Sequence, residues 1–203
     1  VAEELTGKVI EKTKQLKLGT GDQADVSIGA MSSERQIRIV EDHVEQFRND
    51  GAKIEIGGGR NADVHVREGQ NTPQADKDVR VPSLFFAPTV ISGATNDMRA
   101  MQEETFGPTL PIATFKTEEE AISLANDSEF GLNGSVFTND PQAAYDVARR
   151  IRTGAVAQNG MKLEFTAPLG GFKKSGIGRE GGDAAIWNFL ESKTILVDAG
   201  VVV

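Results

Sequence analysis

The fold class is decided by residues 110–159, which read "LPIATFKTEEEAISLANDSEFGLNGSVFTNDPQAAYDVARRIRTGAVAQN". Short apolar runs in this stretch are typical of strands, at 110–115, 131–138 and 154–159. The segments between them are rich in helix formers and open on good capping residues, Thr117 and Asp140. Strand, helix, strand, helix, strand in succession predicts an α/β fold with a mostly parallel, layered sheet.

The N-terminal part predicts a second amphipathic helix and a strand. Residues 33–50 place four apolar side chains on one stripe of a helix: Ile37, Val40, Val44 and Phe47. Ser33 is the expected cap, and Gly51 lies beyond the end. Residues 52–59, "AKIEIGGG", alternate apolar and polar side chains and then turn at glycines. A weaker helix is expected over 2–17, where Gly7 interrupts the helix formers.

Two further stretches are harder to place. Residues 83–92, "SLFFAPTVIS", predict a strand that Pro88 interrupts, so we expect it at a sheet edge or bend. Residues 60–81 are polar and predict a surface excursion with room for a hairpin arm at "DVHVRE". The apolar end of the chain, "ESKTILVDAGVVV", predicts a final strand over 191–203.

Composition narrows the classes of function. The 203 residues are 38% hydrophobic and carry a formal net charge of -8, with 22 basic against 30 acidic residues. This balance repels phosphate backbones and anionic membranes, so we expect neither a nucleic acid nor a membrane as partner. No stretch resembles a membrane span or a signal peptide, and there is no cysteine, which together predict a cytoplasmic protein. Because Val1 falls inside a helix-like pattern without an initiator Met, we expect a piece of a longer chain.

A glycine-rich stretch matches the residue pattern of a dinucleotide-binding turn but lacks the sequence context that such a turn requires. Residues 175–182, "SGIGREGG", contain G-x-G-x-x-G at Gly176, Gly178 and Gly181. That fingerprint requires a strand directly before it, whereas the preceding "LGGFKKS" predicts a loop. A surface loop with solvated lysines is the simpler interpretation, and a free-standing nucleotide-binding module remains an alternative.

Several segments, in this order, resemble the C-terminal part of the aldehyde dehydrogenase superfamily: "EETFGP" (103–108), "FGLNGSVFT" (130–138), "GAVAQN" (154–159), "PLGGFKKSGIGREGG" (168–182) and "ESKTILV" (191–197). In appearance they are nearest to succinate-semialdehyde dehydrogenases. The resemblance implies that residues 1–190 form the C-terminal part of a catalytic domain, with an active-site loop at 159–182. It also implies that residues 191–203 form an oligomerisation strand and that the protein is a homo-oligomer, a dimer or a tetramer.

The resemblance implies oxidation of an aldehyde, with succinate semialdehyde as one candidate, to its acid with NAD or NADP. Such chemistry needs a reactive thiol, a general base and an oxyanion donor near the nicotinamide. The family's cysteine and general-base glutamate match no position here, so the chain holds no catalytic residue, and we expect it to be inactive alone. No metal site is expected. The alternative is a non-catalytic fold and assembly module.

Candidate binding residues also come from the resemblance. Glu104 matches the family glutamate that accepts hydrogen bonds from the nicotinamide ribose, Phe106 the aromatic beside that ribose, and Gln36 a glutamine near the cofactor. Asn159 and Leu169 match the wall of the substrate tunnel. The plainer alternatives are an acidic loop for Glu104, a core position for Phe106 and a solvated side chain for Gln36, with a strand end for Asn159 and loop packing for Leu169. Ala30 and Thr105 depart from the family pattern, which puts the size of the substrate in doubt.

Overall fold

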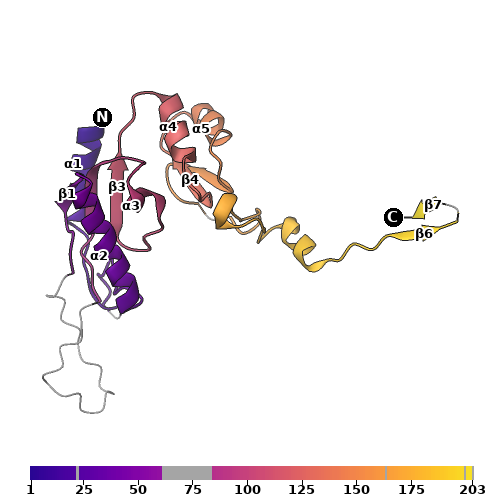
Figure 1. The fold of residues 1–203 in the computed structure, drawn as a ribbon, viewed down its shortest axis with the longest axis horizontal. Coiled ribbons are helices and arrows are strands. Elements are labelled where there is room, and N and C mark those ends of the chain that lie inside the picture. Colours follow the sequence, from indigo (N-terminus) through magenta and orange to yellow (C-terminus); the bar gives the residue numbers. More distant parts are fainter. Residues whose placement is uncertain (22, 61–83, 163, 199, 203) are drawn as a thin grey trace, which may run out of the picture. The chain divides into compact units, whose positions relative to one another are not determined.

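The computed structural model describes residues 1–21, 23–60, 84–162, 164–198 and 200–202. Most of the predicted excursion at 60–81, with its hairpin arm, lies outside them. The chain divides into two compact units, Val1–Phe115 and Lys116–Val203 (Figure 1). Among the described residues, the first unit contains a three-stranded sheet and the second contains two two-stranded sheets. No helix among the described residues is long and apolar enough to cross a membrane.

The first unit is a three-stranded sheet in the order β1-β2-β3. Its strands are β1 (Lys53–Ile56), β2 (Thr89–Ala94) and β3 (Thr109–Ala113). Strand β2 pairs antiparallel with β1 and parallel with β3. The expectation of an edge position for residues 83–92 is therefore wrong. The strand begins just after Pro88, so the missing N–H of the proline falls outside the ladder and β2 can occupy the centre.

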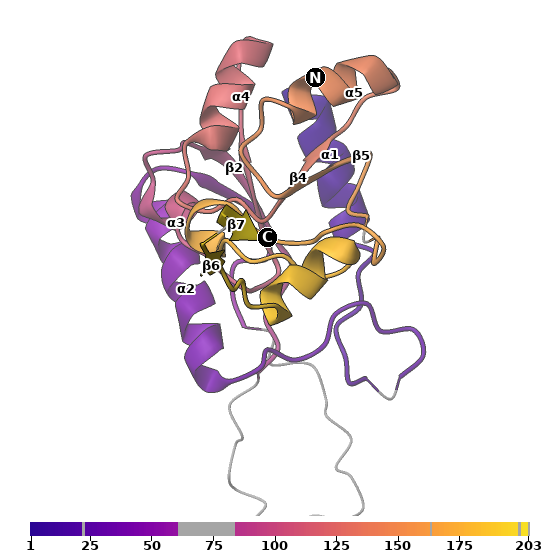
Figure 2. The same ribbon diagram turned by 90° about the vertical axis from the view of Figure 1, so that its right-hand side faces the viewer.

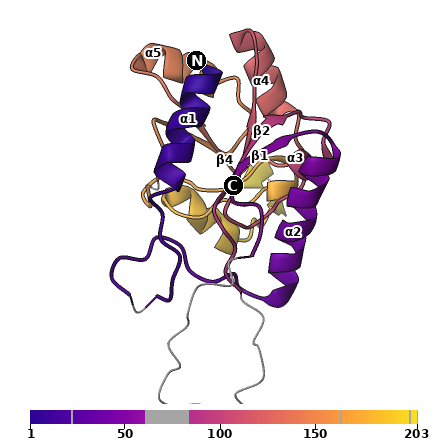
Figure 3. The ribbon, with the colours of Figure 1, turned by 90° about the vertical axis from the view of Figure 1, so that its left-hand side faces the viewer.

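Two helices cover this sheet, and a short third helix follows β2. They are α1 (Ala2–Thr13), α2 (Glu34–Asn49) and α3 (Arg99–Gln102). Figure 3 shows α1 and α2 on either side of the strands. Helix α2 begins as predicted, because Ser33 Oγ accepts a hydrogen bond from the Gln36 amide. Its apolar stripe is buried as expected, whereas α1 buries no side chain.

The core of the first unit lies between α2 and the sheet. One cluster joins Phe47 to Ile91 and the residues after β2, and a second joins the stripe of α2 to Phe86. Phe47, Ile37 and Val40 are at most 1% exposed. Burial of apolar surface stabilises a fold by about 25 cal/mol for each Å² removed from water. The buried side chains of α2 therefore hold this helix against the sheet. Helix α2 in turn positions the candidate site described below.

The second unit contains the remaining predicted elements (Figure 2). They are α4 (Glu118–Asn126), β4 (Asn133–Val136), α5 (Pro141–Ala148) and β5 (Ala155–Gln158). Strands β4 and β5 pair in parallel, and the predicted caps Thr117 and Asp140 both bond the first turns of their helices. The predicted α/β fold is confirmed. Among the described strands, however, β3 pairs only with β2, so the stretch 110–159 contributes to two sheets instead of one.

The C-terminal part of the second unit is mostly loop. Two 3-10 turns, η1 (Lys173–Ser175) and η2 (Asp183–Phe189), precede a small antiparallel hairpin of β6 (Ile195–Val197) and β7 (Gly200–Val202). The prediction of a single strand over 191–203 is therefore wrong. Asp198 directly follows β6, and aspartate favours turns because its side chain can bond the nearby backbone.

Candidate functional site

The turn at 103–107, which carries Glu104 and Phe106, is held against α2 by two side chains. Gln36 Nε2 donates to the carbonyl oxygen of Thr105 at 2.6 Å and approaches that of Phe106 at 3.5 Å. The imidazole of His43 lies 2.9 Å from Thr105 Oγ1 through Nδ1 and 3.0 Å from Glu103 Oε2 through Nε2. His43 is only 3% exposed, so these two bonds satisfy a buried polar group.

Close packing holds the same turn at its end. Phe106 has φ of 44°, a left-handed conformation that is costly for a residue with a side chain. A Cβ on the following Gly107 would lie 2.5 Å from Val40 Cγ2 on α2, so only glycine allows this approach. The turn is therefore fixed by side-chain bonds from α2 and by direct contact with it.

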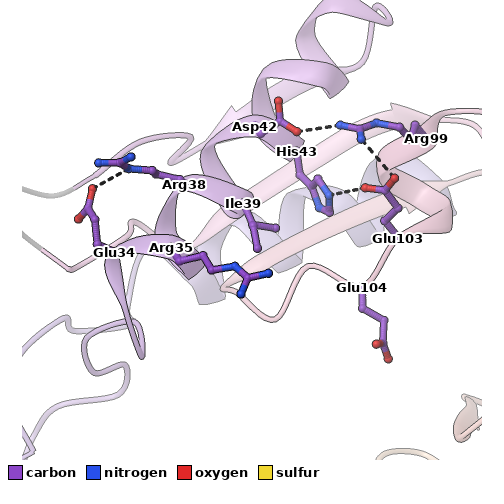
Figure 4. Close-up of a pocket in the computed structure, with 9 residues that line it drawn as sticks. All are labelled: Glu34, Arg35, Arg38, Ile39, Asp42, His43, Arg99, Glu103 and Glu104. Atoms are coloured by element: carbon purple, nitrogen blue, oxygen red, sulfur yellow. Dashed lines mark hydrogen bonds and ion pairs between the residues drawn. The ribbon is translucent and has the colours of Figure 1, made fainter.

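Arg99 also connects the turn to α2, through Glu103 on one side and through Asp42 and Gln46 on the other. Arg99 NH1 lies 3.3 Å from Glu103 Oε1, and Arg99 NH2 lies 2.7 Å from Asp42 Oδ2. Arg99 Nε also donates to Gln46 Oε1 at 2.6 Å. A chain of hydrogen bonds thus runs from α2 through Arg99 and Glu103 back to His43 (Figure 4).

Glu104 stands apart from that chain. Its carboxylate forms no hydrogen bond or ion pair with any of the described residues, and Figure 4 shows it pointing away from the Arg99, Glu103 and His43 contacts. It lines an open cavity of about 710 Å³ between α2 and the turn. Phe106 is 74% exposed, which contradicts the alternative that it fills the core. The site therefore offers a free carboxylate and an exposed aromatic on a rigid support.

Glu34, at the start of α2, lines the same cavity and belongs to a group of paired charges. Arg60 donates to both Glu34 and Glu41, at 2.6 to 3.0 Å. These bonds from the Arg60 guanidinium lower the pKa of both carboxyls, while partial burial opposes the shift. Both groups therefore stay ionised at neutral pH and remain paired.

In the second unit, Asn159 has a local structural task. Its Oδ1 accepts from the Thr138 amide at 2.9 Å and its Nδ2 donates to the Thr138 carbonyl at 3.0 Å. With φ of 57°, it ends β5 in the left-handed region that asparagine tolerates. The amide therefore bonds the Thr138 backbone, and Asn159 directly follows the last residue of β5.

Leu169 lies in the loop that follows β5 in the same unit. Its backbone exchanges two hydrogen bonds of 2.7 Å with Glu180, and its side chain helps line a cavity of about 610 Å³ beside β5. Asn159 is not among the residues that line this cavity. Of the two predicted tunnel residues, Leu169 lines this cavity together with Gln158, which directly precedes Asn159.

The glycine-rich segment forms a close-packed loop. The residues before Gly176 form the 3-10 turn η1, where the dinucleotide fingerprint requires a strand. Lys173 Nζ donates to the Asn126 and Ser128 carbonyls at 2.8 Å each, so it does not point into solvent. A Cβ on Gly154 would lie 1.5 Å from the Gly170 carbonyl oxygen, which shows how closely the loop packs against the start of β5.

Comparison with known proteins decides the family. A family model described as "Aldehyde dehydrogenase family" matches residues 1–195. The chain belongs to the aldehyde dehydrogenase family. It is 36% identical over 196 residues to betaine aldehyde dehydrogenase of Bacillus subtilis, covering 96% of this chain and 37% of that protein. It is also 36% identical to a succinate-semialdehyde dehydrogenase of Schizosaccharomyces pombe that is named for NADP(+), covering 96% of this chain and 36% of that protein.

Solved structures agree with this assignment to the aldehyde dehydrogenase family. The crystal structure of betaine aldehyde dehydrogenase from Staphylococcus aureus in complex with NAD+ matches with a TM-score of 0.81 and 38% identity, covering 94% of this chain and 35% of that one. An aldehyde dehydrogenase from Bacillus cereus also matches with a TM-score of 0.81, at 32% identity and with the same coverage of each chain. This chain therefore spans well under half the length of the relatives it matches.

The sequence of this aldehyde dehydrogenase segment did not predict the roles of two residues at the site. His43 and Arg99 organise the turn that carries Glu104, and neither was predicted to have a role. A signal for His43 was present, since it falls on the apolar stripe of α2 between Val40 and Val44. A polar residue in a buried stripe needs a partner, but the sequence does not reveal which residue that partner is.

Proposed function

We propose that this chain supplies the nicotinamide-ribose contact and one wall of the substrate tunnel in an NAD(P)-dependent aldehyde dehydrogenase. The observation that carries the proposal is the free carboxylate of Glu104, which faces a cavity from a turn that α2 holds in place. A carboxylate accepts hydrogen bonds and donates none, so it suits the two hydroxyls of a ribose. NAD(P)+, when bound, supplies the acceptor for the hydride.

Each supporting residue has a defined task in this proposal. Gln36 bonds the backbone directly after Glu104, and His43 contacts the side chains of Glu103 and Thr105 on either side of it, so little conformational entropy is lost when a ligand binds. Phe106 offers an exposed ring that can pack beside a sugar or a nicotinamide. Gln36 therefore acts through the turn, as a positioning residue.

The aldehyde is proposed from the names of the relatives. Relatives of this chain are named for betaine aldehyde, a pyridine semialdehyde and succinate semialdehyde. We propose that Leu169 contributes an apolar part of the tunnel wall and that Asn159 shapes it through the Thr138 turn. Succinate semialdehyde is the aldehyde to test first, because two of these names are semialdehydes.

The 203 residues alone should not oxidise aldehydes, because no cysteine is present to attack the carbonyl. The assay is reduction of NAD+ or NADP+ by the purified chain with succinate semialdehyde and with short aliphatic aldehydes. We expect no turnover above the rate without protein. Cofactor reduction that persists in a preparation verified to be free of other dehydrogenases would contradict this part of the proposal.

We also propose that the hairpin β6–β7 mediates self-association into a homo-oligomer. Ile195, Leu196 and Val197 are 53%, 74% and 49% exposed, an apolar strand that is prone to pair with another chain. Replacing Leu196 with aspartate should lower the molar mass measured by light scattering to that of the monomer. The matched variant Thr194→Asp, which adds the same charge at an exposed neighbouring position, should leave the mass unchanged. Equal masses for both variants and the unmodified chain would contradict this role of the hairpin.

A further inference from the structure

The charges that line the cavity beside Glu104 are nearly all paired. Arg99 links Asp42 to Glu103 at 2.7 and 3.3 Å, and His43 contacts Glu103 at 3.0 Å. Arg38 lies 3.1 Å from Glu34, which Arg60 also contacts at 2.9 Å. These pairs neutralise one another, so they offer little net attraction to a charged ligand.

Two charged side chains of the lining have no partner among the residues that the structure describes. The Arg35 guanidinium and the Glu104 carboxylate form no hydrogen bond or ion pair within the part of the chain that the structure describes. Arg35 comes from the first turn of α2 and Glu104 from the 103–107 turn, so they border the cavity from two different elements. Figure 4 shows both on the same side, away from the Asp42 and Arg99 pair.

We infer that Arg35 binds the phosphate carried by the same ribose that Glu104 holds, so that the cavity takes a 5′-phosphorylated ribose. The inference rests on the proposed function of Glu104. A guanidinium presents its N–H groups in a planar fork that matches two phosphate oxygens, while a carboxylate matches the sugar hydroxyls. A ribose 5′-phosphate carries both groups at opposite ends of one sugar, and a cavity of about 710 Å³ is in the size range of small-molecule sites.

The chemistry favours a sugar phosphate over a dicarboxylate. A dicarboxylate with one carboxylate at Arg35 would place its second carboxylate near Glu104, and the two negative charges would repel each other. The hydroxyls of a ribose are neutral donors and are not repelled by Glu104. The matching part of the cofactor is its nicotinamide mononucleotide half. Arg35 would then contribute to affinity for the phosphate and not to affinity for the nicotinamide riboside.

The test is a titration of the isotope-labelled chain followed by NMR, with nicotinamide mononucleotide and nicotinamide riboside as probes. These ligands differ only in the phosphate. We expect the mononucleotide to bind about fivefold to tenfold more tightly, with the largest shifts in the first turn of α2 and at Thr105 and Phe106. The preference should shrink at high salt, because Arg35 is exposed.

Variants separate this inference from the proposed function. Arg35→Gln should abolish the preference and leave riboside affinity unchanged, while Glu104→Gln should weaken both ligands equally. Arg38→Gln is the matched control, since it removes the same charge from the same cavity but from a paired residue, and it should keep the preference. Retention of the preference in Arg35→Gln, or its equal loss in Arg38→Gln, would overturn the role of Arg35 alone.

Two other outcomes are also decisive. If Glu104→Gln leaves both affinities unchanged, the proposed ribose contact fails, and the inference fails with it. If neither probe shifts these residues up to its solubility limit, the inference is overturned for this chain. That result would leave open the ribose contact proposed for Glu104 in a longer enzyme, where the adenosine half of the cofactor adds affinity.

Discussion

Replacement of His43 by alanine should lower the free energy of unfolding of the first unit by about 2 to 4 kcal/mol. The change removes a side chain that is 3% exposed and leaves Thr105 Oγ1 and Glu103 Oε2 without their 2.9 and 3.0 Å partners. The cavity left by the buried ring makes the larger contribution, and the two lost hydrogen bonds add about 0.5 to 1.5 kcal/mol each, because the Glu103 side chain is 42% exposed and keeps its Arg99 contact. The turn that carries Glu104 should loosen at the same time.

Chemical denaturation followed by far-UV circular dichroism measures the stability, and amide hydrogen exchange at Thr105 and Phe106 measures the turn. The control is Arg38→Ala on the same helix, whose side chain is 72% exposed and makes a surface pair, so its effect should stay within about 0.5 kcal/mol. His43→Gln can restore one hydrogen bond and should recover part of the loss. Equal stability and equal protection in His43→Ala and Arg38→Ala would contradict the role assigned to His43.

Local signals in the sequence predicted most individual elements. The stripe of α2 and the Ser33 cap appear as expected, and so do the Asp140 cap of α5 and the parallel pair β4–β5. Each of these features depends on residues a few positions apart, so the chain carries the information locally. The turn at Asp198 was a local signal too, but the apolar residues around it suggested one continuous strand.

Long-range pairing was not predictable in the same way. The central position of β2 depends on two partners that come from opposite directions along the chain, and nothing within residues 83–92 encodes it. His43 meets Glu103 and Thr105 across about sixty positions of sequence. The sequence identified which residue types could bond, and only the fold determined which of them meet.

At the candidate site, too, some features could be predicted from the sequence and others could not. Glu104, Phe106 and Gln36 were predicted near one another on the basis of the family resemblance, and the structure brings them together through the Gln36 bond to Thr105. Their roles toward a cofactor stay predictions. That Asn159 and Leu169 share a tunnel wall also stays a prediction, and the amide of Asn159 bonds the Thr138 backbone.

Glu104→Gln should weaken NAD+ binding by the chain about tenfold or more. Glutamine keeps the size of glutamate but loses the charge and replaces one acceptor oxygen with a donor, and hydrogen bonds to charged groups are worth roughly 1.5 to 3 kcal/mol. The starting affinity should be weak, because these residues hold only the nicotinamide end of the cofactor. The comparison variant is Gly178→Val in the glycine-rich loop, where an added Cβ meets no atom within 4 Å.

Calorimetric titration of NAD+ into the unmodified chain and these two variants is therefore the most direct measurement. We expect weak binding that Glu104→Gln largely removes and Gly178→Val leaves unchanged. Tight binding that Gly178→Val abolishes and Glu104→Gln does not affect would contradict it, and would instead place the nucleotide at the glycine-rich loop.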